Sequence, residues 1–120
     1  MAKGPSLRTQ NDSATLVELL EEIKALNIKV LDVRKLTDMT DFMLVATGTS
    51  SRHVSSIVEH LLTESKKLGM KVLGVEGQNS AEWVLVDYGD AVLHVMQGKT
   101  RDFYQLERLW EPVHESERVM

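Results

Sequence analysis

Cysteine is absent from the 120 residues of this sequence. Thiolate zinc sites, thiol catalysis and a disulfide-stapled secreted scaffold are therefore excluded. Proline occurs twice, and aromatic residues make up 5% of the chain. No apolar run approaches the roughly 20 residues of a transmembrane helix, and the N-terminal segment lacks the apolar stretch of a signal peptide. We therefore expect a cytoplasmic protein.

The remaining composition is that of one globular domain, with 42% hydrophobic and 27% charged residues. A chain of this length buries about two thirds of the surface that its unfolded form exposes, which permits a core without disulfides or structural metal. The polar start of the chain has no periodicity, and the end follows a proline. We expect a domain at residues 12–111 between flexible tails at 1–11 and 112–120.

Charge is distributed unevenly along the chain. The formal net charge is −4, yet residues 72–98 contain no Lys or Arg, and their acidic residues alone account for the imbalance. Phosphate backbones attract cations, so this segment would repel nucleic acid and attract a basic protein surface. A solvated acidic face explains the same pattern and stays open as an alternative. The acidic residues of the segment are Glu76, Glu82, Asp87 and Asp90.

Apolar periodicity and turn residues predict the order α-β-β-α-β-β-β-α. A helix between strands implies a crossover and some parallel pairing, while a tight hairpin implies antiparallel pairing. We therefore expect an α/β fold with a mixed sheet of about five strands and packed helices. The expected elements are a helix from Asp12 or Ser13 to Leu26 with Asn27 as its stop, strands at 28–33 and 42–47, a helix ended by Gly69, strands at 70–75, 83–86 and 91–96, and a helix capped by Thr100, with Phe103 on its apolar face, and closed by Pro112.

Residues 48–52 lie at a strand-to-helix turn, where a hydrolase would place its nucleophile. An aspartate, Asp87 or Asp90, and then His94 follow in the order serine, aspartate, histidine. The turn lacks the final glycine of the G-x-S-x-G motif, and no glycine run for an oxyanion hole precedes it. Helix capping by Ser50 or Ser51 explains the same residues. A catalytic serine is therefore disfavoured.

The same turn could bind a phosphate, as in a small nucleotidyl transferase that holds Mg²⁺ on a pair of carboxylates. The nearest pair, Asp87 and Asp90, flanks a hairpin turn, and no third carboxylate stands at a partner position. His53 and His60 are about 10.5 Å apart along a helix, too far to share a metal ion. We expect no cofactor, no metal and no enzymatic activity, and keep the transferase as an alternative.

Trp83, Tyr88 and His94 share the acidic segment. Aromatic residues among carboxylates are more typical of a protein-binding hot spot than of a nucleic-acid stacking platform. A strand tryptophan is most often a core residue, and His94, with Val92 and Met96 on its own face of the strand, also fits a half-buried histidine. Tyr88 lies at the tip of the predicted hairpin, where exposure is expected.

Five segments of the sequence form a recognisable series. They are FMLVATGTSSRHV at 42–54, GVEG at 74–77, WVLVDYGD at 83–90, HVM at 94–96 and RDFYQLERLW at 101–110. In this order they resemble the bacterial ribosomal silencing factor family, the Iojap-like proteins. The resemblance runs from about Leu16 to Trp110 and implies a nucleotidyltransferase-like α/β fold that lacks the transferase chemistry.

The resemblance also implies a function. It implies binding to the large ribosomal subunit through ribosomal protein number fourteen, where the small subunit docks, and repression of translation under nutrient limitation. Homodimers are described for relatives, and neither direct DNA binding nor a membrane is expected. A large-subunit assembly factor would need the same surface and remains the alternative. The residues expected to contact the ribosome are Trp83, Asp87, Tyr88, Asp90 and His94, supported by Glu76 and Glu82, with Asp87 and Asp90 both exposed at the turn.

Overall fold

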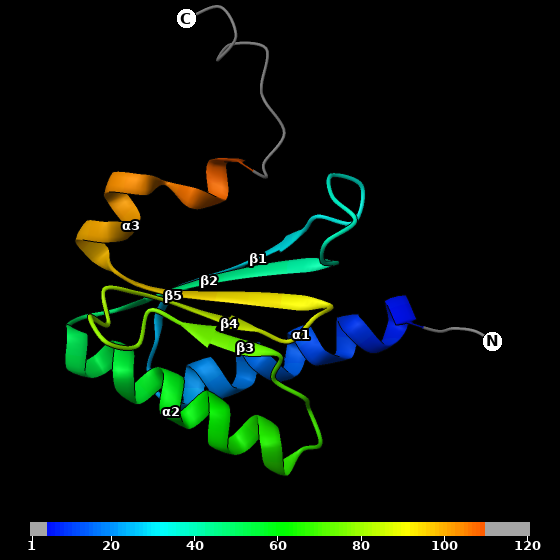
Figure 1. Ribbon diagram of the computed structural model, residues 1–120, viewed down its shortest axis with the longest axis horizontal. Helices are drawn as coiled ribbons and strands as arrows, with labels where there is room; N and C mark the ends of the chain where they lie inside the picture. The colour runs from blue at the N-terminus through cyan, green and yellow to red at the C-terminus, as the bar shows by residue number, and fades with distance from the viewer. Residues whose placement is uncertain (1–4, 110–120) are drawn as a thin grey trace, which may run out of the picture.

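A computed structural model describes residues 5–109 of the chain as helices on both faces of one mixed sheet (Figure 1). The element order matches the predicted α-β-β-α-β-β-β-α series, and the predicted fold class is confirmed. The elements are α1 (Pro5–Glu22), β1 (Leu26–Asp32), β2 (Phe42–Gly48), α2 (Ser51–Lys67), β3 (Gly74–Glu76), β4 (Trp83–Asp87), β5 (Ala91–Gln97), α3 (Gly98–Tyr104) and a short 3-10 helix (Leu106–Leu109).

The sheet has the strand order β1-β2-β5-β4-β3. β2 and β5 pair in parallel, and the other neighbouring strands pair antiparallel. The parallel pair occupies the centre because the chain leaves β2 through α2 and returns at the far edge, β3, from which β4 and β5 fold back in sequence. β2 is buried along its whole length, as its continuous apolar run predicts.

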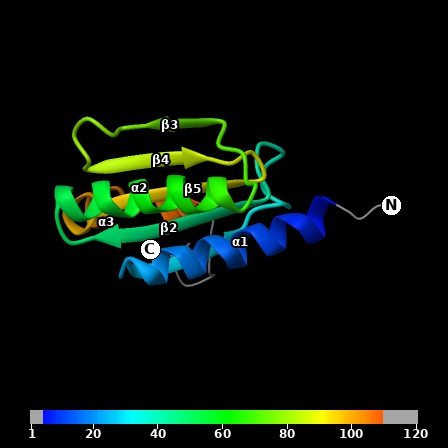
Figure 2. The same ribbon diagram turned by 90° about the horizontal axis from the view of Figure 1, so that it is seen from below.

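α1 and α2 pack side by side on one face of the sheet, which we call the α1/α2 face. α3 lies on the opposite face, the α3 face (Figure 1). Figure 2 shows α2 along the middle of the sheet, with β3 projecting beyond both long helices. The main core fills the α1/α2 face, and its largest fully buried side chains are Leu16, Leu20, Leu44, Ile57, Leu61 and Leu93.

The ends of α2 follow from its local sequence. Ser50 Oγ accepts a hydrogen bond from the backbone N–H of His53 at 3.1 Å, so the predicted serine cap is confirmed. Gly69 has φ +83, which an L side chain rarely adopts, and ends the helix as predicted. Lys66 and Lys67 occupy the last turn, where the helix dipole favours cations.

The first helix is longer at its start than predicted and shorter at its end. α1 begins at Pro5, whose fixed φ suits a first helical turn, and not at Asp12 or Ser13. The helix ends at Glu22, and Lys24 takes a left-handed φ of 61. Leu26 therefore belongs to β1 and is 45% exposed. Asn27 has φ 49 beside an irregularity in the β1–β2 register, and does not end a helix.

Two further predicted elements differ from the structure. The strand predicted at 70–75 is reduced to β3, because only three residues pair with β4. α3 begins at Gly98, and its N-cap, Gln97, makes no side-chain capping bond, so the prediction that Thr100 caps this helix was wrong. Pro112 lies outside the described residues, and the domain limits at 12 and 111 stay predictions. Within the described part of the chain, no helix is long and apolar enough to cross a membrane.

Candidate binding surface on the α3 face

Side chains along β4 point alternately to the two faces of the sheet, so the candidate residues are divided between these faces. Val84 and Val86 are buried in the core on the α1/α2 face, whereas Trp83, Leu85 and Asp87 are half-buried on the α3 face. In the β4–β5 register Leu85 lies opposite His94, and in the β3–β4 register it lies opposite Glu76. Cross-strand partners share a face. The sheet thus brings four of the seven candidates together on the α3 face: Trp83, Asp87, His94 and Glu76.

A hydrogen bond joins the two aromatic candidates. Trp83 Nε1 donates to His94 Nδ1 at 2.9 Å, and the rings lie 5.9 Å apart between centroids. An indole N–H only donates, so Nδ1 accepts and the neutral ring carries its proton on Nε2. His94 is 6% exposed, and burial lowers its pKa from the ordinary 6.5 to about 4. The bond therefore holds a neutral histidine at physiological pH, and His94 is more deeply buried than the half-buried histidine that the sequence suggested.

The aromatic surface continues onto α3. The ring of Tyr104 lies 4.9 Å from that of Trp83, and Phe103 meets Tyr104 edge to face at the same centroid distance. Phe103 is 80% exposed and Tyr104 56% exposed. The expectation that Phe103 belongs to the apolar, inward face of the last helix was wrong. Sequence reasoning missed both residues as surface candidates, although adjacent helical residues point in different directions and cannot both face one core.

Tyr88 lies on the opposite side of the sheet. It packs against the main core, and its hydroxyl lies 3.1 Å from Ser65 Oγ on α2. Burial raises the pKa of the Tyr88 phenol. The expectation of an exposed tyrosine at the hairpin tip is therefore corrected: Tyr88 is half-buried because its ring reaches back over the end of α2.

The remaining acidic candidates lie around the rim of the hairpin. Asp87 Oδ1 accepts from the Gly89 N–H at 2.8 Å, so this carboxylate shapes the turn and is half-buried, not exposed as expected. Asp90 is exposed at the tip, and its backbone carbonyl accepts from Asp41 N at 3.0 Å. Glu76 and Glu82 are also exposed, at the end of β3 and just before β4. The acidic residues therefore extend from β3 and the start of β4 to the β4–β5 turn.

Hydrogen bonds within the protein hold the strand-to-helix turn that follows β2. Thr49 N–H donates to His53 Nδ1 at 2.9 Å, and His53 Nε2 lies 3.1 Å from the Ile23 carbonyl, which ties α2 to the end of α1. A Cβ on Gly48 would lie 2.7 Å from a Val54 methyl group, so glycine permits the close approach of strand and helix. Within residues 5–109, no three His, Asp or Glu side chains gather at metal-binding distance.

Comparisons with known proteins agree with the motif series. The family model described as ribosomal silencing factor during starvation matches residues 7–119. The chain belongs to the ribosomal silencing factor family. A ribosomal silencing factor from Haemophilus influenzae is 47% identical over 95 residues, covering 79% of this chain and 93% of that protein. One from Chromobacterium violaceum is 43% identical over 104 residues, covering 87% of this chain and 85% of that protein.

This chain also matches a mouse protein with a mitochondrial name and a solved structure. A mouse protein named mitochondrial assembly of ribosomal large subunit protein 1 is 35% identical, and the match covers 82% of this chain but 45% of that protein. A crystal structure of a Chromobacterium violaceum protein aligns with a TM-score of 0.83 at 42% identity, covering 89% of this chain and 92% of the other. The shared fold extends over nearly the whole described chain.

Proposed function

We propose that this protein binds the large ribosomal subunit through ribosomal protein number fourteen, sterically blocks its joining with the small subunit and so represses translation under nutrient limitation. Membership of the ribosomal silencing factor family supports the ribosome as target. The proposed activity is binding alone, without catalysis, cofactor or metal. We place the protein in the bacterial cytoplasm.

The observation that carries this proposal is the aromatic row on the α3 face. Phe103, Tyr104 and Trp83 form a continuous row from α3 onto β4, and its outer end is largely exposed. Large aromatic side chains ringed by polar groups are the usual energetic centre of a protein interface. Glu76 and Asp87 flank this row on the same face, and carboxylates attract the basic surfaces typical of ribosomal proteins.

The candidate residues take different parts in this proposal. Trp83 and Glu76 contact the partner, whereas His94 fixes the indole from beneath through its hydrogen bond. Tyr88 positions the hairpin against α2. Asp87 shapes the turn and contributes charge. The exposed carboxylates at the two ends of the hairpin, Glu82 and Asp90, widen the acidic rim.

The dimensions of the molecule support a steric mechanism. The smallest principal extent is 21 Å, so a bound copy holds two facing surfaces apart by more than any side-chain contact can bridge. A standard interface uses roughly 800 Å² from each partner. That is about a tenth of the 7594 Å² of accessible surface, which leaves room for the homodimer that we also propose.

A sedimentation experiment tests the proposal. Purified protein is mixed with separated ribosomal subunits and run on a sucrose gradient. We expect it to travel with the large subunit and to reduce the peak of joined ribosomes. A protein that stays at the top of the gradient, or an undiminished joined peak, contradicts the proposal.

A pair of charge variants then tests which surface is used. Glu76→Lys with Glu82→Lys reverses two exposed carboxylates, one on the α3 face and one next to Trp83 in the chain, and should weaken sedimentation with the large subunit at least about tenfold. The matched control, Glu18→Lys with Glu21→Lys, makes the same change of net charge at exposed positions of α1. Equal weakening by both variants would show that net charge, and not the α3 face, governs binding.

A second candidate function is assistance in assembling the large subunit. The name of the 35% identical mouse relative, which refers to assembly of the mitochondrial large subunit, favours it. Both functions need the same binding surface, so binding data cannot separate them. Removing the gene from its host and separating ribosomal particles does so: accumulation of large-subunit precursors indicates assembly, whereas normal particles with unrestrained translation in starved cells indicate silencing.

A further inference from the structure

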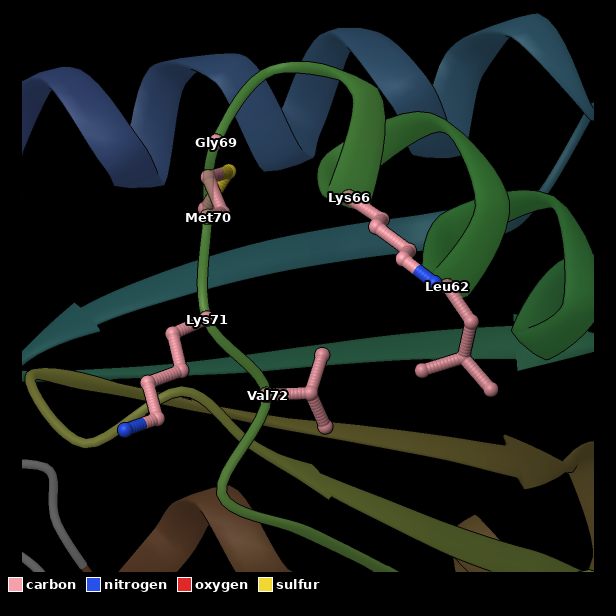
Figure 3. A pocket seen from close by; sticks show the side chains of 6 residues that line it. All are labelled: Leu62, Lys66, Gly69, Met70, Lys71 and Val72. Carbon is pink, nitrogen blue, oxygen red and sulfur yellow. The ribbon is translucent and has the colours of Figure 1, made fainter.

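A shallow groove lies on the other side of the sheet, between the end of α2 and the chain that leads into β3 (Figure 3). Its volume is about 520 Å³. Leu62 and Val72 point toward each other across it, and the side chain of Lys66 lies along α2 above them (Figure 3). The floor of the groove is therefore apolar and open to solvent, and a lysine stands at its rim. The lining residues are Leu62, Lys66, Gly69, Met70, Lys71 and Val72.

The groove continues along the outer side of α2. A second hollow, of about 630 Å³, is lined by Leu62, Thr63, Lys66 and Lys67. The two hollows share Leu62 and Lys66, so they form one trough along the last turns of the helix. We call this the α2 trough. β3 projects beyond both long helices in Figure 2, and both hollows are open to solvent.

Lysines line the α2 trough. Lys67 is paired with Glu64 at 3.1 Å, but among the side chains that the structure describes no ion pair holds Lys66 or Lys71; Lys71 also lines a hollow with Asp12 and Asp90. The helix dipole accounts for lysines in the last turn of α2, whereas Lys71 lies beyond the helix and outside that explanation. These lysines stand beside an apolar floor in a chain whose net charge is −4. Such an arrangement is complementary to apolar side chains flanked by carboxylates.

We propose that the α2 trough docks an acidic amphipathic segment of another protein, with apolar side chains over Leu62 and Val72 and carboxylates against Lys66 and Lys71. A nucleic acid fits less well, because no aromatic side chain lines either hollow to stack a base and the floor offers no charge to a phosphate. A helix laid into a groove with leucine anchors at i, i+3 and i+4 is an established form of such recognition.

The α2 trough is distinct from the aromatic row of the proposed function. Its residues belong to α2 and to the chain that leads into β3, whereas the row lies on the α3 face; Lys71 also lines a further hollow with Asp90 of the acidic rim. One copy of the protein can therefore hold the large subunit with one face and an acidic partner with the other. Loss of one interaction should leave the other intact.

Fluorescence anisotropy with a defined probe tests the site. The probe is a fluorescein-labelled synthetic peptide of about 14 residues, with leucines at helical i, i+3, i+4 and i+7 spacing and glutamates elsewhere. We expect saturable binding to the full chain and at least about tenfold weaker binding to Lys66→Glu with Lys71→Glu. The same peptide with lysine in place of glutamate should bind less well than the acidic probe.

A matched control variant and a second probe test whether the trough itself binds the acidic peptide. Lys35→Glu with Lys99→Glu makes the same change of charge at exposed positions outside the trough, and should bind the acidic peptide within about twofold of the original chain. Equal loss in both double variants, or no saturable binding of the acidic peptide, overturns the proposal. Tighter binding of a labelled oligouridine that the trough variant abolishes would also overturn it, in favour of a nucleic-acid site.

Two readouts keep this result distinct from the ribosome proposal. The trough variant should keep the thermal unfolding midpoint of the original chain, because both lysines are exposed, and should still travel with the large subunit. If charge reversal unfolds the chain, Lys66→Ala with Lys71→Ala replaces it, and undiminished peptide binding by that variant contradicts the proposal. Normal peptide binding with no large-subunit binding would contradict the proposed function alone.

Discussion

The two faces of the sheet are built from the same five strands but bury different side chains. On the α1/α2 face, alternate strand residues meet two long helices and form an apolar core whose central side chains are inaccessible. On the α3 face, Leu106 of the short 3-10 helix packs against a smaller cluster of Val33, Met43, Val45 and Met96. Beside that cluster lie a hydrogen-bonded tryptophan and histidine and two exposed aromatic residues.

This difference separates stability from recognition. Hydrophobic stabilisation grows with the apolar area removed from water, so most of it comes from the α1/α2 face. The α3 face retains aromatic area and carboxylates that folding alone does not need, which are the features that a partner can use. Substitutions on the first face should therefore act on folding, and substitutions on the second should act on binding.

The largest expected effect contrasts one leucine from each face. Leu61→Ala leaves a cavity in the main core and should lower the free energy of unfolding by about 2–5 kcal/mol. Leu85→Ala, at a half-buried position of the α3 face, should cost about 1 kcal/mol, because less area is buried and the site can fill with water. Urea denaturation measures both. Equal losses would show that the α3 face is as much a core as the other.

The second effect is the pH dependence that His94 adds. Its pKa is about 4 in the folded chain and near 6.5 when unfolded, so between these values protons bind preferentially to the unfolded chain. The free energy of unfolding should therefore be intact above pH 6.5 and fall as the pH drops toward 4, by up to about 3 kcal/mol. Comparing chemical unfolding at pH 7 and pH 4.5 in His94→Gln isolates this contribution. A variant as acid-sensitive as the original chain would contradict it.

The third effect tests the placement of Tyr88 on the α1/α2 face. Tyr88→Phe removes the hydroxyl that contacts Ser65 and should lower the free energy of unfolding by about 1 kcal/mol. Sedimentation with the large subunit should not change, since the phenol faces α2. Ser65→Ala completes a double-mutant cycle that isolates the coupling. Lost ribosome binding with normal stability would instead assign Tyr88 to the contact surface.

The smallest expected change of stability is at the exposed end of the aromatic row. Phe103→Ala should alter the free energy of unfolding by no more than about 0.5 kcal/mol, because the ring is 80% exposed. It should nevertheless weaken binding to the large subunit. Met39→Ala, at an 88% exposed residue between β1 and β2, is the matched control and should leave binding unchanged. If both variants bind equally well, the row does not reach the partner.

Much of the fold could be predicted from local sequence, because its signals are local. The apolar run at 42–47, the serine cap of α2, the stop at Gly69 and the hairpin turn around Gly89 each act within a few residues. Predictions failed at the limits of elements. Pro5 is a local start signal for α1 that the predicted start at Asp12 or Ser13 passed over, whereas residues 70–73 stay outside β3 because pairing with β4 begins at Gly74.

The candidate surface was predictable in composition but not in arrangement. Residues 72–98 carry the acidic residues and two of the aromatic ones, which the sequence shows directly. Their division between faces was not visible, because a half-buried tyrosine beside a turn can fold over either side of the sheet. The contribution of Phe103 and Tyr104 arises from the way α3 returns over β4.

The sequence by itself determined the element order, the mixed sheet and the family, because apolar periodicity, turn residues and a series of motifs are local properties of the sequence. Only the tertiary structure decided which residues share a surface. Trp83, His94 and Tyr104 are brought together by strand register and by the path of α3 across the sheet. The same packing placed Tyr88 on the other face and left the α2 trough uncovered, since contacts between distant segments follow from the closing of the core.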